Sequence, residues 1–190
     1  MAQGLFYGVQ VTGSHNPSNY NGIKLIVQGG RDAQEDVTER LESMIEKAER
    51  EGRQPETMPF SLAEERGLVV YNKNPFNDFI DSIQARINME AIRERGLRIL
   101  FDPMHGSGAY PLIALLYTAR CTVDLINLNR DAYFGGLMPA PGEQSLHELR
   151  SKVTSRGYDM GIAFDGDGDR LGIVDANGRY ITANEVLVVL

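Results

Sequence analysis

The second half of the chain alternates regularly between strand-like and helix-like segments, and this alternation constrains the fold more than any other feature. Strand-like stretches occupy 97–101, 122–126 and 160–164, and helical patterns occupy 111–120 and 143–156. A helix between successive strands returns the chain to the same edge of a sheet, so that the strands can pair in parallel. The sequence therefore predicts an α/β fold with mixed, largely parallel sheets covered by helices.

The first part of the chain predicts a smaller region of mixed structure. Stretches 5–11 and 23–27 are β-prone, and a turn-rich segment separates them. Apolar residues at helical spacing over 35–51 predict an amphipathic surface helix. Two prolines and mixed polar residues indicate a connection over 52–65, and 68–71 is a further strand candidate.

A change of pattern near residue 74 indicates a domain boundary. Asn74 and Pro75 are typical of a helix N-cap followed by a first-turn proline, and apolar residues continue at helical spacing as far as Ile92. We therefore expect one domain over 1–73 and a second domain over 74–190.

Composition narrows the class of protein. The formal net charge of −7 opposes binding to nucleic acid, because no basic stripe offsets it. Neither a signal peptide nor a membrane-spanning stretch is apparent, so we expect a cytoplasmic location and no membrane partner. The single cysteine, Cys121, is expected to be a small buried side chain. The apolar run 186–190 suggests that the native protein continues beyond it.

A glycine-spaced acidic loop follows the last strand of the alternating pattern. Asp165, Asp167 and Asp169 stand at alternate positions, where extended side chains project the same way. Converging carboxylates favour a hard cation such as Mg²⁺, with Ca²⁺ or Mn²⁺ also possible. A calcium EF-hand does not fit, because Arg170 and Ala176 stand where its glycine and glutamate are required. A solvated acidic turn is the simpler alternative.

A second polar loop carries a hydroxyl nucleophile after a strand. Ser14 lies in the sequence T-G-S-H-N-P, but Thr12 and Asn16 stand where a serine-hydrolase elbow needs glycines. Such residues also gather in ordinary turns, which remains an alternative. Lys24, on the following strand, is either a solvated lysine or a proton donor and acceptor whose pKa is lowered by burial.

Taken together, these motifs resemble the signatures of the α-D-phosphohexomutase family, which includes phosphoglucomutases and phosphomannomutases. The similar segments are T-G-S-H-N-P at 12–17, Y-N-G-I-K at 20–24, F-D-P-M-H-G-S-G at 101–108 and D-G-D-G-D-R at 165–170. Their order and separation also match. The resemblance covers nearly the whole chain and implies two partial domains, the later part of the family's first domain and most of its second.

The resemblance implies a role for each matching residue. Ser14 would be the phosphorylated catalytic serine, and its phosphate would complete a Mg²⁺ shell formed by the three aspartates. The remaining positions would be His15 and Lys24 for proton transfer or phosphate handling, Asn16 for loop shape and phosphate binding, and Arg170 as an active-site arginine. The family reaction moves phosphate between C1 and C6 of a hexose through a hexose 1,6-bisphosphate.

The resemblance also sets what we expect of the chain as a whole. Its motifs are closer to the glucose and mannose branch than to the glucosamine branch, so the expected ligands are glucose or mannose phosphates. Family segments that select the sugar and clamp its phosphate are not in this sequence. We therefore expect the remaining domains of the same enzyme as partners, and no turnover by this chain alone. The rival interpretations are a noncatalytic metal-binding module and a metal-assisted phosphatase.

Overall fold

The structure is a computed structural model that describes residues 5–72 and 75–189. The chain forms two compact units. The first contains residues up to Val11 together with 23–75, and the second contains 12–22 together with all residues from Phe76 onward. The loop that carries Ser14 therefore belongs to the same unit as the acidic loop.

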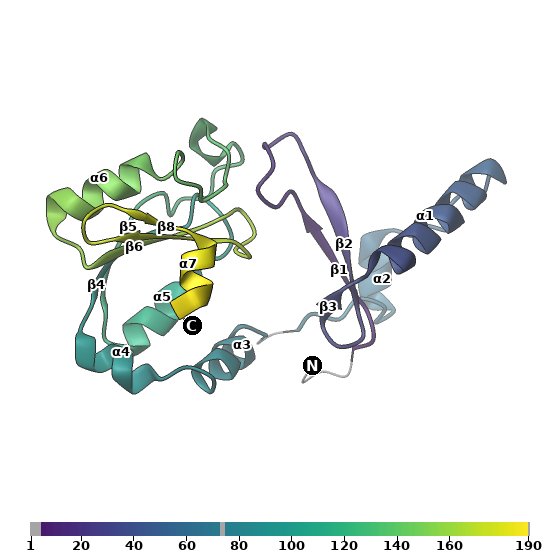
Figure 1. Cartoon of the computed structure of the whole chain (residues 1–190). Helices are drawn as coiled ribbons and strands as arrows, with labels where there is room; N and C mark the ends of the chain where they lie inside the picture. Colours follow the sequence, from purple (N-terminus) through teal and green to yellow (C-terminus); the bar gives the residue numbers. More distant parts are fainter. Residues whose placement is uncertain (1–4, 73–74, 190) are drawn as a thin grey trace. The chain divides into compact units, whose positions relative to one another are not determined.

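A five-stranded sheet forms the centre of the second unit, with the strand order β5-β4-β6-β7-β8 (Figure 1). The strands are β4 (Arg98–Asp102), β5 (Thr122–Leu125), β6 (Met160–Phe164), β7 (Leu171–Asp175) and β8 (Tyr180–Ile181). β4 pairs in parallel with both β5 and β6, whereas β6 with β7 and β7 with β8 are antiparallel. The predicted α/β class with mixed sheets is confirmed, and parallel pairing is confined to the first three strands of this order.

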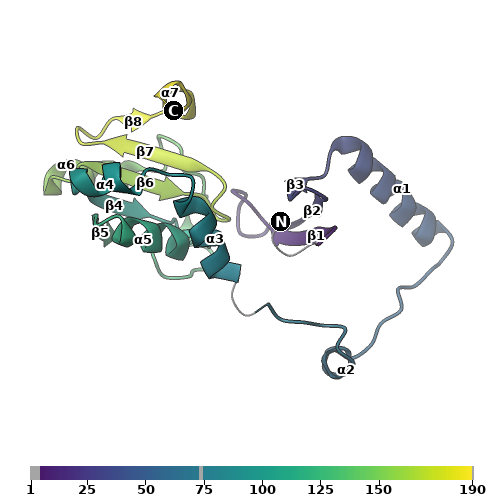
Figure 2. The same ribbon diagram turned by 90° about the horizontal axis from the view of Figure 1, so that it is seen from below.

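Helices cover both faces of this sheet (Figure 2). The helices of the second unit are α3 (Pro75–Gln84), α4 (Met89–Arg95), α5 (Ala109–Thr118), α6 (His147–Arg156) and α7 (Ala183–Val189). Successive residues of β4 point to opposite faces, so Leu100 packs with Leu149 of α6 while Phe101 packs with Leu116 of α5. Cys121 is buried in the second of these cores, as predicted.

The first unit is built from a three-stranded sheet and two helices. These are β1 (Gly8–Thr12), β2 (Gly22–Val27), β3 (Arg31–Asp32), α1 (Glu35–Arg50) and α2 (Phe60–Glu65), with the last residue of β1 and the first residue of β2 assigned to the second unit. β2 is the central strand and pairs antiparallel with β3. Within 5–72, no residue of this unit is fully buried. The strands near 5–11 and 23–27 and the helix over 35–51 form close to where the sequence predicts them, but the unit lacks a closed core.

Several sequence predictions about helix and strand boundaries are wrong. Residues 68–71 do not form a strand, and the predicted connection at 52–65 contains the helix α2. The helix expected to run as far as Ile92 is divided into α3 and α4, because the Asn88 side chain accepts the Ala91 N–H at 3.1 Å and caps a new helix. The proposed N-cap Asn74 lies outside the described residues.

Helix α6 also begins later than predicted, at His147 instead of residue 143. The Ser145 hydroxyl accepts the Gly142 N–H at 3.0 Å and contacts the Ala140 carbonyl, which holds this segment in turns. A hydroxyl that bonds to nearby backbone competes with helix formation.

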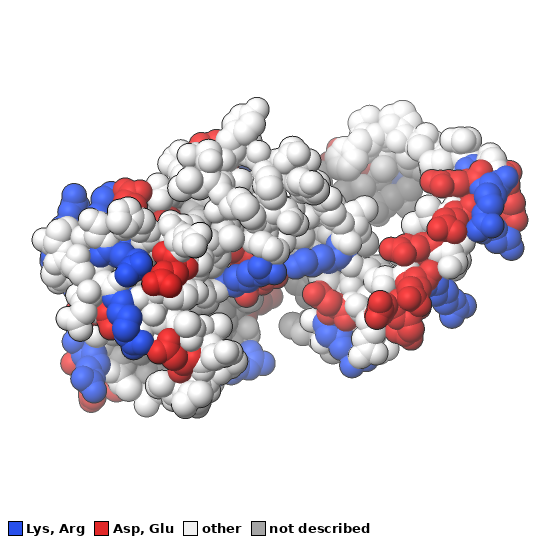
Figure 3. All heavy atoms as spheres, turned by 45° about the horizontal axis from the view of Figure 1, so that its top comes forward, with Lys and Arg blue, Asp and Glu red and all other residues white. Residues whose placement is uncertain are grey.

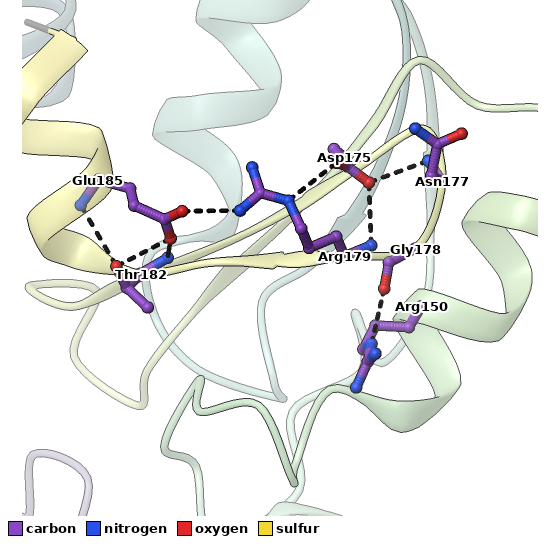
Figure 4. Close-up of polar contacts among 7 residues, drawn as sticks. All are labelled: Arg150, Asp175, Asn177, Gly178, Arg179, Thr182 and Glu185. Carbon is purple, nitrogen blue, oxygen red and sulfur yellow. Dashed lines mark hydrogen bonds and ion pairs between the residues drawn. The ribbon is translucent and has the colours of Figure 1, made fainter.

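The end of the described chain is tied together by charged side chains. Arg179 donates to Glu185 at 2.7 Å and to Asp175 at 3.4 Å, across the β7–β8 hairpin and into α7 (Figure 4). The backbone N–H of Thr182 and the guanidinium of Arg179 lower the pKa of Glu185 to about 2. This carboxylate therefore stays ionised well below the usual range of glutamate.

Charged side chains of both signs are exposed on the surface. Figure 3 shows acidic and basic side chains interspersed on the face that it draws. Among the described residues, no helix has both the length and the apolar character needed to cross a bilayer.

Candidate metal and phosphate site

The acidic loop is held in shape by its most buried carboxylate. Asp165 directly follows β6 and has no exposed surface. Its Oδ1 accepts the backbone N–H groups of Gly168, Asp169 and Arg170 at 2.9, 3.0 and 3.1 Å. Gly168 has a φ of +80°, a conformation that glycine adopts without strain. The loop therefore curls around one oxygen of Asp165.

The other carboxylate oxygens of this loop converge. One oxygen from each of Asp165, Asp167 and Asp169 lies within 4.8 Å of the others. Oδ2 of Asp165 is buried and accepts no hydrogen bond from the described residues. Burial, with the nearby charges of the other two aspartates, raises the pKa of Asp165. A cation among these oxygens would relieve both the desolvation and the repulsion.

The serine loop is hydrogen-bonded to the acidic loop through Thr12. The Thr12 hydroxyl donates to Oδ2 of Asp167 at 2.9 Å and accepts the Ser14 N–H at the same distance. Ser14 has a φ of +50°, which is uncommon for a residue with a side chain. Its hydroxyl lies 3.3 Å from Nδ1 of His15, close enough for proton exchange.

Gly166 is the point where the two loops touch. A Cβ on this residue would lie 2.6 Å from the carbonyl oxygen of Ser14, and 3.5 Å from the side chains of Phe134 and Pro139. No side chain fits in that space. The glycine between the first two aspartates therefore allows the serine loop to lie against the metal loop.

The loop after β4 completes the site. The Ser107 N–H donates to the carbonyl of Gly166 at 3.0 Å, and its hydroxyl lies 3.3 Å from the same oxygen. A Cβ on Gly106 would lie 2.7 Å from that oxygen. The structure thus brings together the loops 12–22, 102–108 and 165–170, each of which follows a strand.

The other residues selected from the sequence take different positions. Asn16 is exposed, and its backbone N–H donates to Gly13 in a turn at 3.0 Å. Arg170 is also exposed, and its backbone exchanges hydrogen bonds with Asp165. Lys24 is half-buried in β2, within the first unit. Their roles in proton transfer and phosphate binding stay predictions.

Two residues of the site were not selected from the sequence. Thr12 was considered only as a departure from the hydrolase elbow, and Ser107 only as part of a motif. A threonine two residues before a candidate nucleophile indicates that its hydroxyl accepts a hydrogen bond from the backbone N–H of the nucleophile. No local signal gives its bond to Asp167, which is 155 positions away.

The fold and the site together define a class of protein. It is an α/β domain in which an acidic loop, a serine loop and a glycine-rich turn lie together at the carboxyl ends of the strands β4 and β6. A family model for phosphoglucomutase/phosphomannomutase, alpha/beta/alpha domain II, matches residues 77–178, and the model for domain I matches 2–52. The chain belongs to the phosphoglucomutase/phosphomannomutase family.

Individual relatives agree with this assignment. The phosphoglucomutase/phosphomannomutase of Thermococcus kodakarensis is 29% identical over 184 residues, which are 96% of this chain and 38% of the relative. A phosphoglucosamine/phosphogalactosamine mutase of Sulfurisphaera tokodaii is also 29% identical, over 90% of this chain and 36% of its own length. This chain therefore spans less than two fifths of either protein.

A solved structure shows the same fold. The open form of the Paramecium phosphoglucomutase pp63/parafusin superimposes with a TM-score of 0.73 at 21% identity, covering 93% of this chain and 36% of that one.

Proposed function

We propose that this chain supplies the phosphoserine loop and the metal loop of an intramolecular phosphotransferase that interconverts hexose 1-phosphate and hexose 6-phosphate. The observation that carries the proposal is the contact between the two loops. Thr12 donates to Asp167, and Gly166 leaves room for the carbonyl of Ser14. A hydroxyl nucleophile is thereby held beside three converging carboxylates.

Asp165, Asp167 and Asp169 would hold the cation, with a phosphate oxygen on Ser14 as a further ligand. Carboxylates and phosphate offer oxygen ligands, which suit Mg²⁺. The buried Oδ2 of Asp165 fits this interpretation, because an ion would satisfy an oxygen that otherwise has no partner among the described residues. When bound, Mg²⁺ would offset the negative charge that gathers on the phosphoryl group.

Ser14 would carry the phosphoryl group between the two ends of the sugar. A hydroxyl of the hexose phosphate forms a bond to the phosphorus while the bond from phosphorus to Ser14 Oγ breaks. The sugar hydroxyl loses its proton, and the serine oxygen gains one. In the second half of the cycle the other phosphate returns to Ser14, which restores the phosphoserine and releases the isomeric product.

Proton transfer in this scheme is assigned to His15 and Lys24. His15 is the better supported of the two, because its Nδ1 lies 3.3 Å from the serine hydroxyl. Lys24 lies in the first unit, and its role rests on its match to the family motif. Asn16 and Arg170 are proposed to bind phosphate oxygens, and Arg170 is exposed beside the metal loop.

The proposed substrate rests on the motifs, and the proposed partners rest on the length of the relatives. Glucose or mannose phosphate is proposed as the substrate, and hexose 1,6-bisphosphate as the activating phosphate donor. Since the relatives are more than twice as long as this chain, further domains of the same enzyme are proposed to bind the sugar and its distal phosphate. We therefore expect no turnover by the 190-residue chain alone.

Replacement of the serine tests the proposal in a form of the protein that contains those further domains. Ser14→Ala should abolish conversion of glucose 1-phosphate and mannose 1-phosphate in the presence of Mg²⁺ and the bisphosphate. A metal-assisted phosphatase activates water instead, so it would retain release of inorganic phosphate in the same variant. A noncatalytic metal-binding module would show neither activity before or after the replacement, and either result would contradict the mutase proposal.

A further inference from the structure

A buried carboxylate outside the metal loop joins the loops that follow β4 and β5. Asp102, the last residue of β4, is only 4% exposed. Its Oδ1 accepts the Met104 N–H at 2.8 Å, and the side-chain amide of Asn127 donates to both of its oxygens at 3.2 and 3.1 Å. The carboxylate thereby ties its own loop to a residue 25 positions later.

The residues around this pair adopt a backbone conformation that is costly for side chains other than glycine. Met104, His105 and Asn127 have φ values of +48°, +62° and +52°. Such residues persist where the surrounding structure holds them. Here the His105 N–H donates to the Asn127 carbonyl at 3.0 Å, and its Nδ1–H donates to the Asn129 carbonyl at 2.8 Å.

The loop that these bonds hold lies directly against the metal loop. Ser107 donates to the Gly166 carbonyl, and Gly106 is so close to the carbonyls of Asp165 and Gly166 that a Cβ would lie 2.7 Å from each. Gly166 separates Asp165 from Asp167, so its position sets the positions of both carboxylates.

We propose that Asp102 and Asn127 are positioning residues for the metal site. Their hydrogen bonds fix the loop 103–108, that loop fixes Gly166, and Gly166 sets the geometry of the neighbouring carboxylates. Asp102 does not belong to the group of carboxylates that converge on one point, so it acts through the loop. The inference rests on the proposed cation site at the three aspartates.

Substitution of Asn127 tests this proposal through metal affinity, without reference to activity. Asn127→Asp would set a second carboxylate against Asp102 and break the pair. The dissociation constant for Mn²⁺, measured on the 190-residue chain from the electron paramagnetic resonance signal of the free ion, should rise by about tenfold or more. The added negative charge alone would favour cation binding, so a weaker affinity points to changed geometry.

A reciprocal exchange provides the rescue. In the double variant Asp102→Asn with Asn127→Asp, an amide and a carboxylate again face each other, and the amide oxygen introduced at position 102 can still accept the Met104 N–H. The Mn²⁺ affinity of this variant should return close to the wild-type value. An affinity that stays as weak as in Asn127→Asp would contradict the proposal, because complementarity of the pair would then not be the cause.

Asn177→Asp is the matched control. Asn177 lies in the β7–β8 turn, where its backbone N–H donates to Asp175. Asp175 pairs with the first residue of β6, and the metal loop follows the last residue of that strand. Asn177 therefore lies at the opposite end of β6 from the metal loop. The same chemical change there should leave Mn²⁺ affinity unchanged. If the wild-type chain binds no Mn²⁺, the proposed cation site is wrong. If wild type and Asn127→Asp bind equally well, the positioning role is wrong.

Hydrogen exchange of the wild-type chain keeps the inference testable if Asn127→Asp does not fold, which circular dichroism would reveal. Addition of Mg²⁺ should slow amide exchange in 103–108 and around Asn127 as well as in 165–170, because the three segments form one hydrogen-bonded assembly. Slowing confined to 165–170 would overturn the positioning role.

Discussion

The helices α1 and α6 of the two units bury their apolar side chains to different extents, although α1 is the more strongly amphipathic of the two. Leu149 and Val153 of α6 in the second unit have no exposed surface, whereas Leu41 and Ile45 of α1 in the first unit are 41% and 51% exposed. Both helices lie within the stretches that the sequence predicts to be helical. Only α6 packs on a sheet with buried side chains opposite it. The pattern indicates which face of a helix is apolar, but burial depends on the rest of the fold.

The serine loop of the candidate site is held by contacts within the second unit. The Ser14 loop connects β1 and β2 of the three-stranded sheet, yet its contacts assign it to the second unit. Its hydroxyl anchor, Thr12, is bonded to Asp167. The contacts between the serine loop and the metal loop therefore lie within the unit that has two hydrophobic cores.

The largest expected difference between the units is the loss of unfolding free energy when a leucine is replaced by alanine in each of them. Leu149→Ala removes a fully buried side chain and should lower the free energy of unfolding by about 2–5 kcal/mol. Leu41→Ala, in α1, should lower it by less than about 1 kcal/mol. Urea denaturation followed by circular dichroism measures both. Equal effects would show that α1 is buried in solution, and would remove the distinction between the units.

A smaller effect is expected from filling the contact between the two loops. Gly166→Ala places a Cβ 2.6 Å from the Ser14 carbonyl and should cost about 1–3 kcal/mol of stability, because neither backbone can move freely. It should also weaken Mn²⁺ binding. Gly142→Ala is the control, since a Cβ there meets no atom within 4 Å. Thermal unfolding that is the same for both variants would refute the close packing of the serine and metal loops.

The exposed apolar stripe of α1 should bind a hydrophobic dye. Leu41→Glu with Ile45→Glu should reduce the fluorescence of bound anilinonaphthalene sulfonate, while the unfolding free energy of the second unit should stay nearly unchanged.

Paired strands of the first unit could also join to another copy through exposed edges. Unchanged dye binding, together with a monomeric elution volume for the wild-type chain, would argue against an exposed apolar surface in this unit.

The smallest expected effect concerns acid stability at the end of the second unit. The pKa of Glu185 is lowered from 4.5 to about 2, so its carboxylate stabilises the fold above pH 4.5 and this contribution is lost as the pH falls toward 2. The melting temperatures of wild type and Glu185→Gln should therefore converge over that range. Glu56→Gln, at an exposed position outside helices and strands, should show no such convergence. A constant difference for Glu185→Gln would contradict the assigned interactions.

Much of the fold follows from local sequence patterns. The strand at 160–164 has the predicted limits, and β4 and β5 differ from their predicted limits by no more than one residue at either end. Strong β-prone runs between glycines and turn residues specify such strands. The errors fall where a side chain overrides the pattern, as at Asn88, or where a short helix such as α2 has a weak signal.

The candidate site is predictable in part for a similar reason. Asp165, Asp167 and Asp169 lie close in sequence, so their spacing alone indicates that they converge. The bond between Thr12 and Asp167 depends on the arrangement of the two loops. The bond between Asp102 and Asn127 depends on the pairing of β4 with β5. Contacts between distant residues need the topology first.

Transfer of phosphate to Ser14 is the most direct test of the proposed mechanism. The protein, carrying whatever native sequence flanks residues 1–190, should be incubated with glucose 1,6-bisphosphate and Mg²⁺, digested and examined by phosphopeptide mass spectrometry. The account predicts phosphate on Ser14, which a hexose 6-phosphate then removes when Mg²⁺ is present. An unmodified Ser14 that the bisphosphate cannot charge would contradict the covalent mechanism.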